Sequence, residues 1–253
     1  MLRNASTLSL LPDPQGRRVF YQDVAASPEG EADLELHASA VLDLATGQSE
    51  QLEQAVATIW DGMLSSDALE GHAVWSDDGS RLACVGAEGV VLKGFGSGVA
   101  DLAIPLDSRR VGGMSLVDGQ LVVALTLGFS GELQSYSCTN GEHLATHAFA
   151  DSSAWSGGWT LVPKALAADG SGDLFVTTET FGYLVDLKTL SPCQRFVGGR
   201  AYAAATDTVL CDDQAGAAYS LHQRYSVQRL IDRGQQMLGP QTMGERWLSA
   251  HGA

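Results

Sequence analysis

A pattern of short apolar runs and tight turns recurs five times along this chain, and it restricts the fold more than any other feature. In each copy the runs are separated by turns rich in Asp and Gly, such as Asp77–Gly79 in the second copy and Asp118–Gly119 in the third. Glycine in such turns supplies the positive φ that a tight hairpin needs. The pattern therefore predicts hairpin after hairpin of antiparallel strands.

Each copy predicts four strands. The copies cover Ser6–Ile59, Gly71–Ile104, Gly113–Phe149, Lys164–Val197 and Arg200–Ile231. A single flat sheet of so many strands would curl or split. Packing four-stranded blades radially solves this problem, because few edges are left unprotected. The sequence therefore predicts an all-β fold, a β-propeller of about five four-stranded antiparallel blades in one domain over residues 1–231.

The repeats are uneven, and the pattern stops after Ile231. Residues 232–253 are expected to form a C-terminal tail, either frayed or with a short helix around Trp247 that docks on a blade. Three predicted loop insertions lengthen the copies: Asp23–Asp33, Trp60–Glu70 and Ala150–Pro163. The chain starts on an inner strand and ends on an outer strand, so no strand interlocks the first and last blades. An open ring and a ring completed by another chain both fit this order.

Two stretches resemble known propeller repeats. Residues 71–86 read GHAVWSDDGSRLACVG, which resembles the WD-repeat pattern without its closing Trp-Asp pair. Residues 174–178 (LFVTT), 183–189 (YLVDLKT) and 41–47 (VLDLATG) are similar to YVTN-type repeats. The resemblance implies a β-propeller, whose task in most relatives is to bind proteins. It does not single out one family.

The charge balance restricts the partners of this protein. Against 30 Asp and Glu the chain has only 15 Lys and Arg, which gives a net charge of −15. Nucleic acids and anionic membranes attract clustered basic residues, so neither is an expected partner. No stretch of about 18 apolar residues predicts a membrane span. The start, Met1–Leu11, is read as a first strand rather than a signal peptide, and we expect a cytoplasmic protein.

Motifs for common chemistries are missing from the sequence, which has no nucleophile elbow, zinc-protease helix, phosphate-binding loop or calcium loop. The cysteines Cys84, Cys138, Cys193 and Cys211 have no close pair, so we expect free thiols buried as small apolar groups. His143 and His147 are expected to share one face of a solvated outer strand. We predict no catalytic residue, metal or cofactor.

Acidic residues recur where second strands are expected to turn into third strands. The five turn positions are Asp23, Glu88, Ser130, Glu179 and Asp213, and all of them except Ser130 are acidic. Such turns share one rim of a propeller, and the insertions Trp60–Glu70 and Ala150–Pro163 are expected to reach the same rim. Tryptophan is enriched at the energetic centres of protein interfaces. The predicted binding residues at this rim are therefore Trp60, Asp61, Glu88, Trp155, Trp159, Glu179 and Asp213.

The expected function is that of a non-catalytic protein-interaction or scaffold module, present as a monomer or as a subunit of a hetero-complex. One alternative is a hydrolase like the lactonases that YVTN-type propellers resemble, with carboxylates around a central site. Convergence of Glu88, Glu179 and Asp213 would favour that alternative. The other is a structural subunit that completes its ring with a partner chain.

Overall fold

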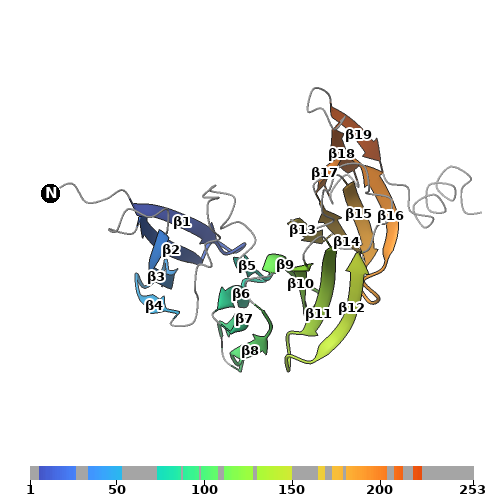
Figure 1. Ribbon diagram of the computed structural model, residues 1–253. Helices are drawn as coiled ribbons and strands as arrows, with labels where there is room; N and C mark the ends of the chain where they lie inside the picture. The colour runs from blue at the N-terminus through green and yellow to red at the C-terminus, as the bar shows by residue number, and fades with distance from the viewer. Residues whose placement is uncertain are drawn as a thin grey trace, which may run out of the picture.

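Strands in five antiparallel sheets make up the described structure of this chain (Figure 1). The computed structural model describes residues 6–26, 34–52, 73–86, 88–96, 98–107, 111–127, 130–149, 165–168, 173–178, 181–203, 208–212 and 219–223. All regular secondary structure within these ranges is β-strand. The prediction of an all-β fold with about five antiparallel blades is therefore confirmed.

The sheets, called blades 1 to 5 here, follow one another in chain order. Blade 1 contains β1 (Ser6–Pro12), β2 (Arg18–Ala26), β3 (Leu34–Asp43) and β4 (Ser49–Gln51). Blade 2 contains β5 (Ala73–Trp75), β6 (Arg81–Gly86), β7 (Gly89–Gly94) and β8 (Leu102–Pro105). Blade 3 contains β9 (Val111–Val117), β10 (Gln120–Leu127), β11 (Ser130–Ser137) and β12 (His143–Phe149).

Blades 4 and 5 complete the described structure. Blade 4 contains β13 (Ala165–Ala168), β14 (Asp173–Thr177), β15 (Phe181–Asp186) and β16 (Pro192–Val197). Blade 5 contains β17 (Gly199–Ala203), β18 (Thr208–Asp212) and β19 (Tyr219–Gln223). Its predicted fourth strand, within Tyr225–Ile231, and the tail 232–253 lie outside the described residues.

The predicted turn at Asp23 is wrong. Asp23 lies inside β2, where it is paired with Leu8 on one side and Ala38 on the other. An Asp is a common turn residue, but here the backbone on both sides of it is engaged by neighbouring strands, so the strand continues to Ala26. The insertion predicted from Asp23 to Asp33 therefore starts too early.

Apolar clusters between consecutive blades form the core. Successive side chains of a strand point to opposite faces, so each blade has an upstream face toward the preceding blade and a downstream face toward the following one. In β10, Leu121 and Val123 pack upstream with blade 2, whereas Val122 and Ala124 pack downstream with blade 4. Burial on both faces explains the nearly continuous apolar run of this strand.

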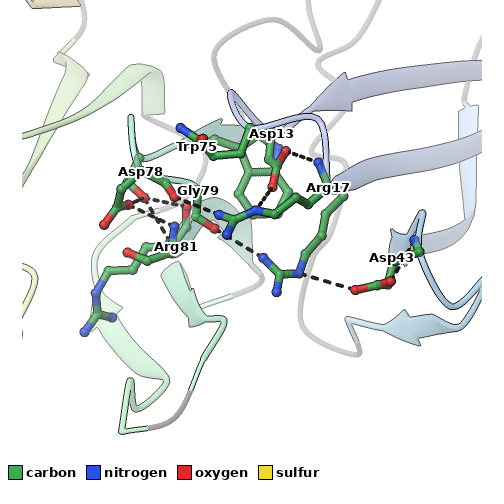
Figure 2. Close-up of polar contacts among 12 residues, drawn as sticks. Asp13, Arg17, Asp43, Trp75, Asp78, Gly79 and Arg81 are labelled. Atoms are coloured by element: carbon green, nitrogen blue, oxygen red, sulfur yellow. Dashed lines mark hydrogen bonds and ion pairs between the residues drawn. The ribbon is translucent and has the colours of Figure 1, made fainter.

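Blade 1 is joined to blade 2 largely through polar contacts between their first turns (Figure 2). The Arg17 Nη2 group donates to the carbonyl oxygen of Asp78 at 2.9 Å. The Trp75 Nε1 group donates to the carbonyl oxygen of Leu11 at 3.0 Å. Farther out, the Lys93 Nζ group lies 2.7 Å from a carboxylate oxygen of Glu50. The apolar part of this junction is a small cluster around Phe20, Val41, Trp75 and Leu82.

The turn in blade 2 is itself tightly bonded. The carboxylate of Asp78 accepts hydrogen bonds from the Ser76 hydroxyl at 2.7 Å and from the Ser80 backbone N–H at 2.9 Å. The Ser76 hydroxyl, followed by the Ser80 groups, lowers the pKa of Asp78 to about 2. This carboxylate therefore stays ionised and holds the turn in the shape that receives Arg17.

Blade 5 is offset from the line of the other blades. Among the described strands, the first strands β5, β9 and β13 contact one another in sequence, whereas β17 packs chiefly on β15 and β14. Glycines allow the backbones of blades 4 and 5 to approach closely here, because a Cβ added to Gly199 would lie only 2.8 Å from the Cα atom of Gly182. Figure 1 shows blades 1 and 5 at the two ends of an arc.

Replacing Gly79 by Ala tests the junction of blades 1 and 2. A Cβ at Gly79 would lie 3.0 Å from both the Arg17 Nη2 and the Asp13 Oδ2 atoms, and Asp13 is buried. Gly119 has the same left-handed backbone, with φ +72° against +65°, but nothing lies within 4 Å of its added Cβ. Backbone strain alone should cost Gly119→Ala about 1 kcal/mol.

We expect Gly79→Ala to lower the free energy of unfolding by at least about 1 kcal/mol more than Gly119→Ala, because it also disturbs a buried carboxylate. Urea unfolding at pH 7 measures both values. Equal losses in the two variants would mean that the junction tolerates the added methyl group.

Candidate functional site

Two rims are defined by the ends of the strands. The 2–3 rim is the end where second strands turn into third strands and where each blade connects to the next. The 1–2 rim is the opposite end. The 2–3 ends of blades 3 and 4 lie side by side, because Phe149 at the 2–3 end of β12 contacts Tyr183 of blade 4. The 1–2 ends of blades 1 and 2 also lie side by side, because the first turns of these blades are joined by a hydrogen bond.

One predicted binding residue, Glu88, lies in the described structure. It occupies the turn between β6 and β7, is exposed, and accepts a backbone hydrogen bond from Leu106 at 3.3 Å through its carbonyl oxygen. The other six predicted residues lie outside the described residues: Trp60, Asp61, Trp155, Trp159, Glu179 and Asp213. The structure therefore tests the position of Glu88 alone, and the other six residues stay predictions.

Aromatic side chains of blades 3 and 4 gather where these blades meet near the 2–3 rim, and we call this surface the 3–4 seam. Its members are His147 and Phe149 on β12, Phe181 and Tyr183 on β15, and Arg195 and Val197 on β16. The cross-strand pairs Tyr183–Arg195 and Phe181–Val197 put four of them on the upstream face of blade 4. The segment 150–164, which holds Trp155 and Trp159, follows Phe149 directly in the chain.

The seam is a continuous series of ring contacts. The ring of His147 meets Phe149 at 5.2 Å between centroids, and Phe149 meets Tyr183 at 5.3 Å, both edge to face. Tyr183 lies 6.0 Å from Phe181, and the Arg195 guanidinium stacks 5.0 Å above the Phe181 ring. Edge-to-face pairs and cation–π contacts hold rings and guanidinium in fixed orientations.

Burial divides the seam into a base and a surface. Phe149 and Tyr183 are buried, whereas Arg195 is exposed and Val197 is 58% exposed. An Arg already stacked on a ring loses little side-chain freedom when it binds a carboxylate or a carbonyl. The seam therefore offers a fixed cationic group beside an apolar side chain, a combination that suits a protein or peptide ligand.

Sequence reasoning missed the seam. The alternation of Phe181 with Tyr183 and of Arg195 with Val197 indicates that each pair shares a strand face. Nothing in the sequence shows that these faces meet β12 of another blade. The contact of Phe149 with Tyr183 is set by the packing of two blades, which strand periodicity does not contain.

The expectation that His143 and His147 share a strand face is wrong. His147 is paired with Leu133, which packs downstream, but His143 is paired with Tyr136, which packs upstream. The register shifts between Ser135 and Tyr136, and this irregularity inverts the alternation of β12. The two imidazoles therefore point to opposite faces, and the predicted pair does not form.

Few features of the described residues point to chemistry. Within the described ranges, no group of three or more His, Cys, Asp and Glu side chains is arranged to hold a metal ion. None of the elements described is a helix long and apolar enough to span a membrane. All four cysteines are free thiols; three are buried as predicted, but Cys193 is exposed because it lies on the outer strand β16.

Thiol labelling separates these cysteines. Burial raises the pKa of Cys84 to about 12 and that of Cys138 to about 11, and it also raises the pKa of Cys211. The thiolate is the reactive form, so at pH 8 we expect Cys193 alone to react quickly with a disulfide reagent in the folded protein. Denaturant should release the other three thiols, and Cys193→Ser should abolish the fast phase. A second fast thiol in the native protein would contradict this burial pattern.

Comparison with solved structures shows the fold. Hsv2 of Kluyveromyces lactis is matched with a TM-score of 0.51 at 8% identity, over 88% of this chain and 76% of that chain. A putative 6-phosphogluconolactonase of Bacteroides uniformis is matched with a TM-score of 0.47 at 12% identity, over 86% and 81%. BamB of Moraxella catarrhalis is matched with a TM-score of 0.45 at 13% identity, over 82% and 58%.

These neighbours are β-propeller proteins, and the chain has a β-propeller fold. Identities this low show the fold and nothing about a shared activity. No protein-family model matches the chain, and no curated protein matches it. The activity therefore has to be inferred from surfaces of this chain.

Proposed function

We propose that this β-propeller is a non-catalytic protein-interaction module that binds a protein partner at its 2–3 rim. The observation that carries the proposal is the 3–4 seam, where Arg195 and Val197 are exposed above a packed aromatic base. Arg and aromatic residues dominate the centres of protein interfaces, and a rigid scaffold keeps the ordering cost of binding low.

The remaining predicted residues extend this surface. Glu88 is exposed on the same rim, and the segment with Trp155 and Trp159 leaves the described structure at Phe149 of the seam. We propose that these tryptophans enlarge the apolar part of the interface. The acidic positions Glu88, Glu179 and Asp213, together with Trp60 and Asp61, would flank it. A partner with an acidic or carbonyl group for Arg195 and basic groups for the carboxylates fits this arrangement.

The double substitution Arg195→Glu with Val197→Asp tests the seam. It reverses the exposed charge and makes the apolar position polar, so we expect at least about 30-fold weaker partner binding, or about 2 kcal/mol. The partner is first identified by affinity capture with quantitative mass spectrometry, and its affinity for each purified variant is then measured by calorimetry.

Leu144→Asp is the matched control, because Leu144 is also an exposed apolar residue of an outer strand but lies near the 1–2 rim. It should bind as the wild type does. If the seam variant keeps wild-type affinity for every captured protein, the interface lies elsewhere and the proposal fails.

The double substitution Trp155→Ala with Trp159→Ala tests the neighbouring segment. If the tryptophans belong to the interface, partner binding should be lost while the melting temperature changes by less than about 2 °C. Thermal unfolding and the same binding assay give both values. A large fall in melting temperature would instead identify the two rings as part of the core.

A further inference from the structure

A row of three polar side chains lies on the otherwise apolar upstream face of blade 3. Glu132, Gln134 and Tyr136 are alternate residues of β11, and their partners in β10 are apolar residues that pack toward blade 2. The Tyr136 hydroxyl donates to the Gln134 Oε1 atom, and the Gln134 Nε2 group donates to the Glu132 Oε1 atom. The row is therefore one hydrogen-bonded chain that runs from the buried phenol to the carboxylate of Glu132.

Tyr136 fixes the direction of this chain of hydrogen bonds. Burial, followed by the charge of Glu132, raises the pKa of the Tyr136 phenol. The phenol therefore keeps its proton and donates it to the Gln134 Oε1 atom, which turns the amide nitrogen of Gln134 toward Glu132. The carboxylate of Glu132 is thus held through Oε1, while its Oε2 atom has no hydrogen-bond partner among the described residues.

Glu132 lies at the 2–3 end of blade 3, next to the 3–4 seam. It is near the start of β11 and is paired with Ala148, the chain neighbour of the seam residue Phe149. Glu132 is partly exposed and faces upstream, whereas Phe149 packs downstream with Tyr183. The carboxylate and the seam therefore lie on the two sides of one blade end. Stacked sheets lie about 10 Å apart, a distance that about three extended residues cover.

The charges around Glu132 favour a cationic ligand. In the described part of the chain, no Lys, Arg or His forms an ion pair with Glu132. The net charge of −15 attracts basic segments to the protein and repels acidic ones. A guanidinium or ammonium group forms short, strong hydrogen bonds with a carboxylate. Because Gln134 already orients this carboxylate, it loses little freedom when a cation binds to it.

We propose that the partner bound at the 2–3 rim places a lysine or arginine side chain on Glu132, which makes Glu132 a specificity-determining residue of the interface. This inference rests on the proposed function, because it extends the same interface from the seam to the other side of blade 3. Arg195 receives a carboxylate or carbonyl group of the same ligand. Two fixed charges of opposite sign select a segment by the order of its own charges, which an apolar contact cannot do.

Random peptides of about twelve residues, displayed on phage, are the probe, because this length is more than enough to cross the blade end. They are selected against the full wild-type chain, and fluorescence anisotropy measures the affinity of each synthetic peptide. We expect the selected peptides to contain a Lys or Arg whose replacement by Gln weakens binding to the wild type about tenfold. In Glu132→Gln, which keeps the shape of the side chain, the same replacement should change the affinity less than about twofold.

Glu142→Gln is the matched control. Glu142 is exposed in the turn between β11 and β12, at the 1–2 rim of the same blade, so this variant removes the same charge at the opposite end. It should keep the wild-type preference for basic peptides. Circular dichroism checks that both variants fold, and Glu132→Ala takes the place of Glu132→Gln if the latter does not.

Glu132→Lys gives the decisive result. A selected peptide whose basic residue is replaced by Glu should bind this variant at least about tenfold better than it binds the wild type. The proposal is overturned if no peptide is selected, if the peptides show no basic preference, or if the preference survives in Glu132→Gln.

The seam variant Arg195→Glu with Val197→Asp separates this inference from the proposed function. Peptides that lose affinity for the seam variant but bind Glu132→Gln as they bind the wild type would support the proposed function and refute the role of Glu132. Peptides that depend on Glu132 but bind the seam variant at full strength would support the role of Glu132 and contradict the seam as the interface.

Discussion

Each four-stranded blade of this chain must bury two apolar faces, and no blade can do so alone. β10 shows the requirement most clearly, because alternate side chains from Leu121 to Ala124 pack on blade 2 and blade 4. A small antiparallel sheet is unstable in water unless something covers its apolar face. In the described structure, consecutive blades cover each other's apolar faces. The packing of each blade on the next in chain order follows from this one constraint.

The sequence predicted the fold through its turns. Hairpins such as Asp118–Gly119 combine a left-handed backbone with two apolar strands, and those local signals predicted the five antiparallel sheets in chain order. The errors arose where a local signal competed with pairing on both sides. Asp23 has the chemistry of a turn residue, yet it sits in a central strand whose neighbours engage its backbone. The irregular register in β12 and the offset of blade 5 have no local signal at all.

The candidate site was predictable only in outline. Topology assigns Glu88 to an exposed turn on the 2–3 rim, as the sequence indicated. The seam of His147, Phe149 and Arg195 required knowledge of which blade faces which, because its members come from strands far apart in the chain. Strand alternation tells which residues share a face, and packing between sheets decides which faces meet. Sites between repeats are therefore harder to predict than sites on turns.

The polar junction of blade 1 has a consequence for how the chain opens. Large apolar clusters join blade 2 to blade 3 and blade 3 to blade 4, whereas blade 1 is joined by a smaller apolar cluster together with the polar contacts of Arg17, Trp75 and Lys93. Such contacts lie near solvent, where each contributes little free energy. Repeat proteins open locally at their weakest junction, and amide exchange reports the free energy of each such opening. Amides of β2 and β3 should therefore exchange with solvent before those of β10, because blade 1 should separate more easily than the central blade 3.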